Sequence, residues 1–469
     1  MASIRTALPK ARPNRDRAGA QSALTPHWLR DQLVDRFGLS THTSLKLAYS
    51  GGVDSEVLLH LLVGLHRETA WPISAIHVDH GLSPNAHAWV AHCRARCRAL
   101  TVPLQVEHVR IATKREEGVE AGARRARYQA LKAHIGTNEV LLTAQHQQDQ
   151  AETLLLRLLR GAGYRGMSSM APQMRFGGGQ LVRPLLETSK PAIVDYANAQ
   201  KLVWVIDEMN HDPALARGYL RERVMPALRQ FWPAASAQLA HAANHAAEAS
   251  AVLDELAQLD LEQCRLENGT GLSVAALNEL SPGRRKNVLR YWFVWQSRLP
   301  PSSRHLAQIV HTIGQKPSTA KAILREGESE VRRYRDQIFL ASAVDGPMAS
   351  RWAASWNPED PLVLPANAGT LRAFQDFGRG LSLNRVAEQA LHVRFRRGGE
   401  VCQLPGRKHH HKVKKLLQDA GIPPWERDRI PFIYLGDDLA AVGQNWVCAP
   451  YAAASGEPSL RFVIEQTAK

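Results

Sequence analysis

The chain has 469 residues, 44% of them hydrophobic, so it can form two or three domains with buried cores. It carries 59 lysines and arginines against 44 acidic residues, and the net charge of +15 favours a polyanionic partner such as nucleic acid over the alternative of a merely basic enzyme. Five scattered cysteines argue against a disulfide framework and fit a reducing cytoplasm, and the lack of a run of about 18 apolar residues argues against a membrane span.

Residues 1–25 contain arginines, prolines and small residues without an apolar core. A secretory signal needs such a core, so these residues do not form one. We interpret them as a disordered basic extension, and an organelle transit peptide is the alternative.

The sequence SGGVDS at residues 50–55 lies between an apolar run at 45–49 and a pattern of helical period from residue 56. This order predicts a strand, a glycine turn and a helix. The glycines let the backbone approach a ligand, and the N–H groups at the start of the helix favour an anion. Asp54 would repel phosphate unless its carboxylate and the phosphates share a Mg²⁺ ion. The segment therefore predicts a phosphate-binding loop, with a plain serine–glycine turn as the alternative.

Further strand and helix patterns alternate after this loop, which predicts a parallel sheet with helices on both faces. In such doubly wound α/β sheets, ligands bind at the carboxyl ends of the strands. Strands are expected at residues 72–78, 104–109 and 140–143, and helices at 86–99, 119–134 and 151–160.

Two pairs of charged residues on these helices are candidates for chemistry. Asp149 and Glu152 are three residues apart and share a helix face, where they could bind an amino group or Mg²⁺. Helix capping is the alternative, because carboxylates favour a helix N-terminus. Arg124 and Arg127 share a face of the preceding helix and could bind phosphate or developing negative charge. A solvated basic face is the alternative for the arginines.

The composition changes near residue 234, where an alanine-rich, helical and basic pattern begins. Beyond residue 343 the pattern loses its period and then becomes a mixture of short strands and helices. We therefore predict an α/β domain at 26–233, a helical nucleic-acid-binding domain at 234–343, a linker at 344–385 and a small mixed α+β domain at 386–469.

The last domain contains a dense basic run at residues 407–415 with three consecutive histidines. Consecutive residues cannot all face one metal ion, so we favour phosphate contact over a metal site, and such contact would depend strongly on salt. Trp425 and Tyr434 could stack on exposed bases, but core packing is the preferred interpretation for both.

Four motifs occur in an order and spacing typical of one family: SGGVDS at 50–55, HVDHGL at 77–82, EAGARRARY at 120–128 and DQAETLLLRLLRGAG at 149–163. The first resembles the pyrophosphate loop of the N-type ATP pyrophosphatases. Together, the four resemble the tRNA(Ile)-lysidine synthetases. Segments at 183–186, 207–221 and 396–428 fit the same family, so the resemblance covers about residues 45–445.

The resemblance implies an enzyme that uses ATP and Mg²⁺ to adenylate the C2 carbonyl oxygen of the wobble cytidine in an isoleucine tRNA with the CAU anticodon. The ε-amine of free L-lysine then attacks C2 and expels AMP. The product, lysidine, pairs with A rather than G and changes the identity of the tRNA from methionine to isoleucine. A cytoplasmic location is expected, and the sequence leaves open whether the protein is a homodimer.

The resemblance also implies roles for individual residues. Asp54 would hold Mg²⁺, and Arg124 would support charge at the reacting phosphate. Asp149 and Glu152 would bind the lysine ammonium or a metal and help the amine lose its proton. The expected ATP-binding residues are Ser50, Gly51, Gly52, Val53, Asp54 and Ser55, and the expected tRNA-binding residues are Arg217, Arg221, Arg397, Lys412, Lys414 and Lys415.

Four positions depart from the pattern usual in that family. Gln145 and Gln148 replace a histidine and an aspartate, but the carboxylates of the following helix are kept. Met209 replaces a serine, and Gly218 replaces an asparagine. These departures concern local contacts with substrate rather than the chemistry itself.

Two other functions are alternatives to this one. A tRNA thiolase with the same loop would need a catalytic cysteine or an iron–sulfur set, whereas Cys93 and Cys97 are spaced as buried thiols on a helix. A non-catalytic tRNA-binding module would be favoured by loss of Asp54, Arg124 or Asp149, and all three are present.

Overall fold

A computed structural model describes residues 23–81, 83, 85–110, 119–207, 212–266, 271–314, 321–326, 329–342, 352–386 and 390–465. Contacts divide the chain into two compact units, Met1–Val252 and Leu253–Lys469. The 30-residue helix α10 (Ala235–Cys264) runs across the division. No helix within the described ranges is long and apolar enough to cross a membrane.

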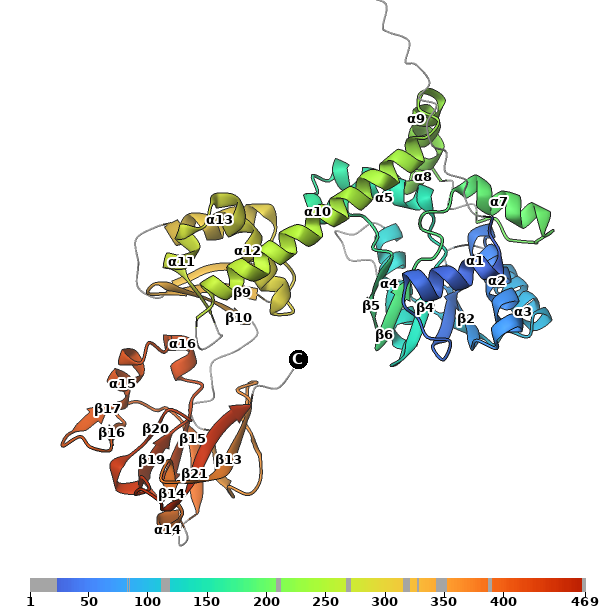
Figure 1. Cartoon of the computed structure of the whole chain (residues 1–469). Coiled ribbons are helices and arrows are strands. Elements are labelled where there is room, and N and C mark those ends of the chain that lie inside the picture. Colours follow the sequence, from blue (N-terminus) through green and yellow to red (C-terminus); the bar gives the residue numbers. More distant parts are fainter. Residues whose placement is uncertain are drawn as a thin grey trace, which may run out of the picture. The chain divides into compact units, whose positions relative to one another are not determined.

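The first unit is built on a six-stranded sheet with the order β3-β2-β1-β4-β6-β5 (Figure 1). All neighbouring pairs are parallel except β5 and β6, which form an antiparallel hairpin. This confirms the parallel, doubly wound sheet expected from the sequence. The strands are β1 (Ser44–Ala48), β2 (Ile73–Asp79), β3 (Leu104–His108), β4 (Glu139–Leu142), β5 (Gln173–Phe176) and β6 (Gly179–Val182).

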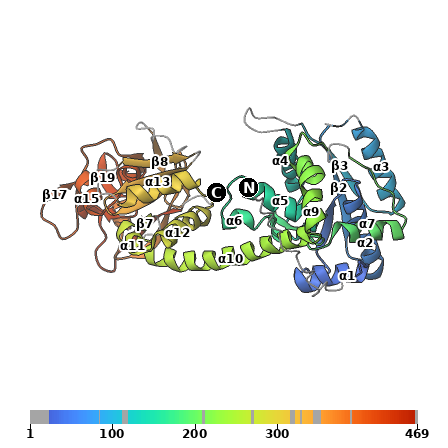
Figure 2. The same cartoon turned by 90° about the horizontal axis from the view of Figure 1, so that it is seen from above.

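Helices cover both faces of this sheet. One face packs against α1, α2, α3 and α7 through a large apolar cluster, and the other packs against α4 through a smaller one. Figure 2 shows α4 and the α1–α2–α7 group on opposite sides of the sheet. The helices are α1 (Pro26–Asp31), α2 (Val53–Thr69), α3 (Ala86–Ala99), α4 (Val119–Ala133), α5 (Gln147–Leu159), α6 (Tyr164–Met167), α7 (Lys190–Ala199), α8 (Ala216–Tyr219) and α9 (Met225–Phe231), with π-helical turns η1 (Gln32–Arg36) and η3 (Leu220–Val224).

The second unit begins with helices, as predicted, but also contains a four-stranded antiparallel sheet that the sequence patterns did not predict. Its order is β7-β10-β9-β8, and α12 and α13 pack against it around the buried Trp292. The strands were missed because their alternation is interrupted by arginines such as Arg333, which is buried and donates to the carbonyl of Thr312 at 2.8 Å. The elements are β7 (Gly271–Ser273), α11 (Val274–Glu279), α12 (Pro282–Trp295), α13 (Ser303–Gly314), β8 (Lys321–Glu326), β9 (Ser329–Tyr334) and β10 (Gln337–Ser342).

The expectation of a linker at 344–385 is wrong for residues 353–385, because this part forms strands of the C-terminal sheets. One sheet has the order β11-β15-β18-β19-β20, a second has β12-β13-β21-β14, and β16 pairs with β17. Residues 343–351 lie outside the described ranges. The elements are β11 (Ala353–Trp356), β12 (Leu362–Val363), β13 (Thr370–Phe377), β14 (Leu381–Ser382), α14 (Leu383–Val386), β15 (Leu391–Phe395), β16 (Val401–Gln403), β17 (His410–Lys412), α15 (Val413–Asp419), α16 (Pro424–Arg427), β18 (Pro431–Leu435), β19 (Asp438–Val442), β20 (Trp446–Val447), η4 (Ala449–Tyr451) and β21 (Pro458–Glu465).

The C-terminal cores contain two features that bear on the sequence analysis. Tyr434 is 4% exposed, and Trp425 packs edge-on against Tyr334 and Phe339, so both aromatic residues serve packing as preferred. Cys402 and Cys448 form a disulfide with their Cα atoms 5.5 Å apart, which differs from the expectation drawn from five scattered cysteines. Tertiary folding brings them together across 46 residues.

Candidate active site

The predicted loop at 50–55 connects β1 to α2 and has the geometry of an anion cradle. Gly51 has φ +83°, and a Cβ atom there would lie 3.0 Å from Sγ of Cys93 and 3.1 Å from Cγ2 of Val205, so only glycine fits. The hydroxyl of Ser55 donates to the Gly52 carbonyl at 2.9 Å and lies 3.1 Å from that of Ser50. Gly52 is the N-cap of α2, and no side chain caps the first N–H groups of this 17-residue helix.

The loop opens into a pocket of about 400 Å³ at the carboxyl ends of β1, β2 and β4. The segments that follow β1 and β4 lie beside each other where the strand order reverses, which is the usual ligand site of a doubly wound sheet. Of the residues predicted for the site, the pocket is lined by Ser50, Gly52, Asp54, Ser55, Arg124, Asp149, Arg217 and Arg221.

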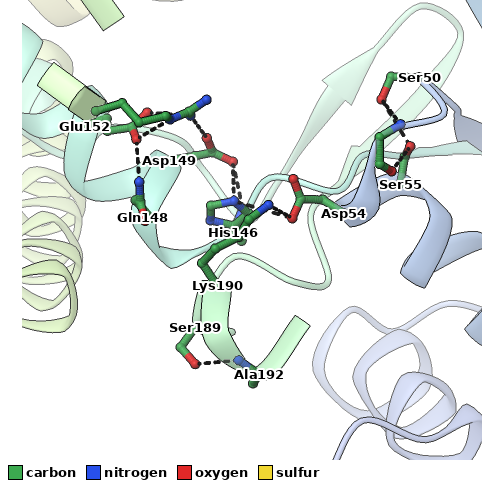
Figure 3. Close-up of polar contacts among 12 residues, drawn as sticks. Ser50, Asp54, Ser55, His146, Gln148, Asp149, Glu152, Ser189, Lys190 and Ala192 are labelled. Carbon is green, nitrogen blue, oxygen red and sulfur yellow. Dashed lines mark hydrogen bonds and ion pairs between the residues drawn. The ribbon is translucent and has the colours of Figure 1, made fainter. Parts of the chain in front are cut away.

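Asp54 is not free in this structure. Its Oδ1 atom accepts from Nζ of Lys190 at 2.5 Å, and Nε2 of His146 lies 3.6 Å from the same oxygen (Figure 3). Lys190 was not recognised in the sequence, because it lies 136 residues away at the first turn of α7 and carries no local motif. Its only sequence signal is a lysine after the N-cap Ser189, where acidic residues are more common.

Asp149 caps its helix and also lines the pocket. Helix α5 begins at Gln147, four residues before the predicted start, and Oδ2 of Asp149 accepts from the backbone N–H of the N-cap His146 at 3.1 Å. Oδ1 of Asp149 pairs with Nη2 of Arg221 at 3.3 Å and the residue lines the pocket. Burial by itself raises the pKa of Asp149, but the charges of His146, Arg217 and Arg221 lower it by a larger amount. The net shift of the pKa is therefore downward, and the carboxylate stays charged.

Glu152 lies behind the pocket rather than in its wall. It is 0% exposed, and Arg221 donates to both of its oxygens at 3.0 and 2.9 Å. Nε2 of Gln148 donates to Oε1 of Glu152 at 3.0 Å (Figure 3). The two carboxylates thus share a helix face, as predicted, and are bridged by Arg221. Glu152 therefore acts on the pocket indirectly, because it holds Arg221, which lines the pocket.

The arginines of α4 approach the pocket from the other face of the sheet. Arg124 lies 4.8 Å above the ring of Tyr128 and its Nη2 is 3.3 Å from the Tyr128 hydroxyl. Arg127 also lines the pocket, and burial lowers its pKa. Both arginines therefore face the pocket, which agrees with a phosphate-binding function and argues against a solvated face. The aromatic ring fixes Arg124 without neutralising its charge.

The donor set fits ATP with a Mg²⁺ ion held jointly by protein and phosphate. Asp54 is a hard oxygen ligand at the pocket, and the loop presents N–H groups and hydroxyls. Among the described residues, no group of three histidine, cysteine or acidic side chains could hold a metal alone. A Mg²⁺ ion would therefore need phosphate oxygens and water to complete its ligands.

The expected tRNA-binding residues are divided between the two units. Arg217 and Arg221 belong to the first unit, where Arg217 donates to Oγ1 of Thr153 at 2.8 Å and Arg221 binds the carboxylates of α5. Arg397, Lys412, Lys414 and Lys415 are exposed in the second unit. The buried Val413, Leu416 and Leu417 hold α15 in place and leave its lysines at the surface.

The departure at Gly218 has a structural reason, whereas Met209 lies outside the described ranges. A Cβ atom on Gly218 would lie 1.9 Å from the carbonyl oxygen of Asp212, so the preceding segment occupies the space of a side chain. Gln145 pairs with Oγ1 of Thr143, and Gln148 donates to Glu152. Gln145 therefore lines the pocket, whereas Gln148 lies behind it with Glu152.

The sheet order, the loop and the pocket define an ATP-pyrophosphatase-type nucleotide-binding domain, and a family profile described as PP-loop domain matches residues 27–228. Profiles described as TilS substrate binding domain and TilS substrate C-terminal domain match residues 272–339 and 391–464. Proteins named tRNA(Ile)-lysidine synthase are 39% identical in Coxiella burnetii, over 89% of this chain and 92% of the relative, and 42% identical in Pseudomonas aeruginosa, over 84% and 88%. The one from Escherichia coli O157:H7 is 39% identical over 92% of this chain and 98% of its own length. The chain belongs to the tRNA(Ile)-lysidine synthase family.

Proposed function

We propose that this protein ligates free L-lysine to C2 of the wobble cytidine of an isoleucine tRNA with the CAU anticodon, using ATP. The observation that supports this most strongly is a phosphate loop and a charged carboxylate, Asp149, lining one pocket in a chain whose relatives carry that name. The reaction needs both, because the oxygen on C2 must be activated by transfer of AMP from ATP, and the lysine amine must be bound beside the same carbon.

In the first step, O2 of the cytidine attacks the α-phosphate of ATP, and pyrophosphate leaves. The loop N–H groups and the hydroxyls of Ser50 and Ser55 would hold the phosphates, and Mg²⁺ at Asp54 would supply charge neutralisation. Arg124 would stabilise the negative charge that develops on the transferring phosphate. C2–O of cytidine is a poor leaving group, and esterification to phosphate makes it a good one.

In the second step, the lysine ε-amine attacks C2 and AMP leaves with the former O2. The amine has a pKa of about 10.4 in water, so it arrives as an ammonium ion. Asp149 would bind this ammonium beside the reacting carbon and help it lose a proton. Glu152 would hold Arg221, and through it the wall of the pocket, in position.

The second unit would bind the tRNA through exposed cations, including Arg397 and the lysines of α15, while Arg217 and Arg221 would meet the nucleotide that enters the pocket. These tRNA contacts and a homodimer remain predictions. A cytoplasmic location is part of this proposal, because tRNA and free lysine are found there.

The thiolase alternative is not favoured by the state of the cysteines. Burial raises the pKa of Cys93 to about 12 and that of Cys97 to about 11. Neither side chain lines the pocket. Thiols of this kind are poor nucleophiles at neutral pH.

The test is incorporation of radiolabelled lysine into a CAU-anticodon isoleucine tRNA transcript with ATP and Mg²⁺, with AMP and pyrophosphate measured in parallel. We expect label in the tRNA in equal amount to AMP. A transcript with uridine at the wobble position is the control and should remain unlabelled. Release of AMP without lysine transfer would contradict the proposed nucleophile.

A further inference from the structure

The carboxylate that would bind a metal ion, that of Asp54, is in contact with a lysine side chain. Lys190 contacts Oδ1 of Asp54 at 2.5 Å, and the two side chains are 30% and 29% exposed (Figure 3). Nε2 of His146 lies 3.6 Å from the same oxygen and also 3.6 Å from Oδ2 of Asp149, which is farther than a hydrogen bond in both cases. Among the residues that the structure describes, the nearest charged partner of the loop carboxylate is therefore the ammonium group of Lys190.

Stability alone does not account for this lysine. It is the first residue of α7, a ten-residue helix whose N-terminus carries partial positive charge, so a cation there is unfavourable. An ion pair that is about one third exposed to solvent also contributes little to folding. The lysine is placed at the loop at some cost to its own helix, which points to a role in ligand binding.

We propose that Lys190 exchanges partners during the reaction: it pairs with Asp54 before a metal ion binds, and it binds a phosphate oxygen of ATP once a divalent cation occupies Asp54. The inference rests on the proposed use of ATP and Mg²⁺. An ammonium group and a metal ion cannot share one carboxylate oxygen closely, because both are cations. The incoming phosphates offer Lys190 an anionic partner beside the one it loses.

Two consequences follow for binding. The metal alone binds weakly, because it must displace Lys190 from Asp54. The nucleotide and the metal bind cooperatively, because each removes a charge that would otherwise be left unpaired. By linkage, the nucleotide must raise metal affinity by the same factor as the metal raises nucleotide affinity.

The experiment compares the wild-type protein with Lys190→Met in binding assays that need no turnover. Mn²⁺ binding is measured by electron paramagnetic resonance with and without α,β-methylene-ATP, whose α–β bond cannot be cleaved. We expect Lys190→Met to bind Mn²⁺ several-fold more tightly without nucleotide. We expect it to bind the analogue about tenfold more weakly in the presence of metal, the usual loss for one charge-assisted hydrogen bond.

Two further variants separate this role from a general effect of charge. Lys201→Met removes the same charge two residues beyond the end of α7, where the side chain is exposed, and should match the wild type in both assays. Lys190→Arg keeps a cation at the loop and should retain most of the analogue affinity. Melting temperatures of all variants establish that they are folded.

Either of two results overturns the proposal. Unchanged Mn²⁺ binding without nucleotide would show that Lys190 does not compete at Asp54, and unchanged analogue affinity would show that it does not bind phosphate. Failure of the wild-type protein to bind the analogue at all is a different result. It would contradict the proposed function itself, together with the inference that rests on it.

Discussion

The hydroxyl of Tyr49 donates a 2.6 Å hydrogen bond to Oε2 of Glu56, which joins the residue before the phosphate loop to the residue after it. Glu56 is 0% exposed, and its other oxygen accepts from Nε of Arg96 at 2.5 Å. Burial and the neighbouring Glu56 raise the pKa of Tyr49, so the hydroxyl keeps its proton and remains a donor. This pair closes the base of the loop and limits its width.

Tyr49 also lines the pocket, and we expect Tyr49→Phe to weaken ATP binding because the base of the loop loses this hydrogen bond. The change leaves one oxygen of a buried carboxylate unpaired, which costs about 1–3 kcal/mol of folding free energy. The melting temperature should fall, and the KM for ATP in a pyrophosphate-release assay should rise severalfold with a smaller change in kcat.

Tyr196→Phe is a matched control for that experiment. Tyr196 of α7 makes a 2.9 Å hydrogen bond to Nδ1 of His60, which lies on α2 like Glu56. Tyr196 does not line the pocket. This control should lower the melting temperature and leave the KM for ATP unchanged. Equal effects of the two variants on KM would show that the Tyr49 contact serves stability only.

Asp54→Asn should abolish adenylation while leaving tRNA binding nearly intact. The amide keeps the shape of the side chain but loses the charge that pairs with Lys190 and would hold Mg²⁺. Formation of AMP from ATP measures the chemistry, and filter binding measures the tRNA complex. If both were lost together, Asp54 would have a structural role instead.

Binding of lysine should depend little on pH between about pH 5.5 and 8.5, where both the ammonium and Asp149 are charged. The pKa of Asp149 is lowered from its ordinary value, so lysine binding and the stabilising contacts of the carboxylate are lost only as the pH falls through that lowered pKa and the carboxylate takes up a proton. Calorimetric titration with lysine across this range checks the prediction. A steep loss of affinity near pH 6 would instead assign the ammonium contact to a different group.

Replacing Lys412, Lys414 and Lys415 together by alanine should weaken tRNA binding and flatten its salt dependence. Each lost phosphate contact reduces the slope of log affinity against log salt by about 0.7–0.9. The three side chains are exposed, so the fold should be preserved. Replacement of the same residues by arginine keeps the charge and should keep the slope; alanine variants that bind as tightly as the wild type would exclude this surface.

Gly218→Asn should destabilise the first unit, although asparagine is usual in the family at this position. The new Cβ atom would lie 1.9 Å from the Asp212 carbonyl oxygen, and overpacking of this kind typically costs about 1–3 kcal/mol. Thermal unfolding measures the effect. Gly163→Asn is the control, because a Cβ atom on Gly163 would meet no atom within 4 Å and should leave the melting temperature nearly unchanged.

The strands and helices that carry the site could be predicted from the sequence because each is encoded locally. Alternation of apolar runs and helical patterns specified the parallel sheet, and the glycines and Asp54 specified the loop. The antiparallel sheet of the second unit was missed, since strands such as β9 carry buried arginines whose partners come from elsewhere in the chain. The strands at 353–385 carry no local pattern that identifies them, because their partners lie up to 95 residues away, as for Thr370 and Glu465.

The sequence by itself determined the chemistry that the pocket offers: a phosphate loop, an acidic helix start, and arginines on the preceding helix. Only the tertiary structure decided which of these groups meet. It placed Lys190 on Asp54 from the start of α7, and it put Asp149 in the pocket wall while Glu152 lies behind Arg221. Local patterns specify backbone conformation and residue type, whereas the pairing of charges depends on which elements fold against one another.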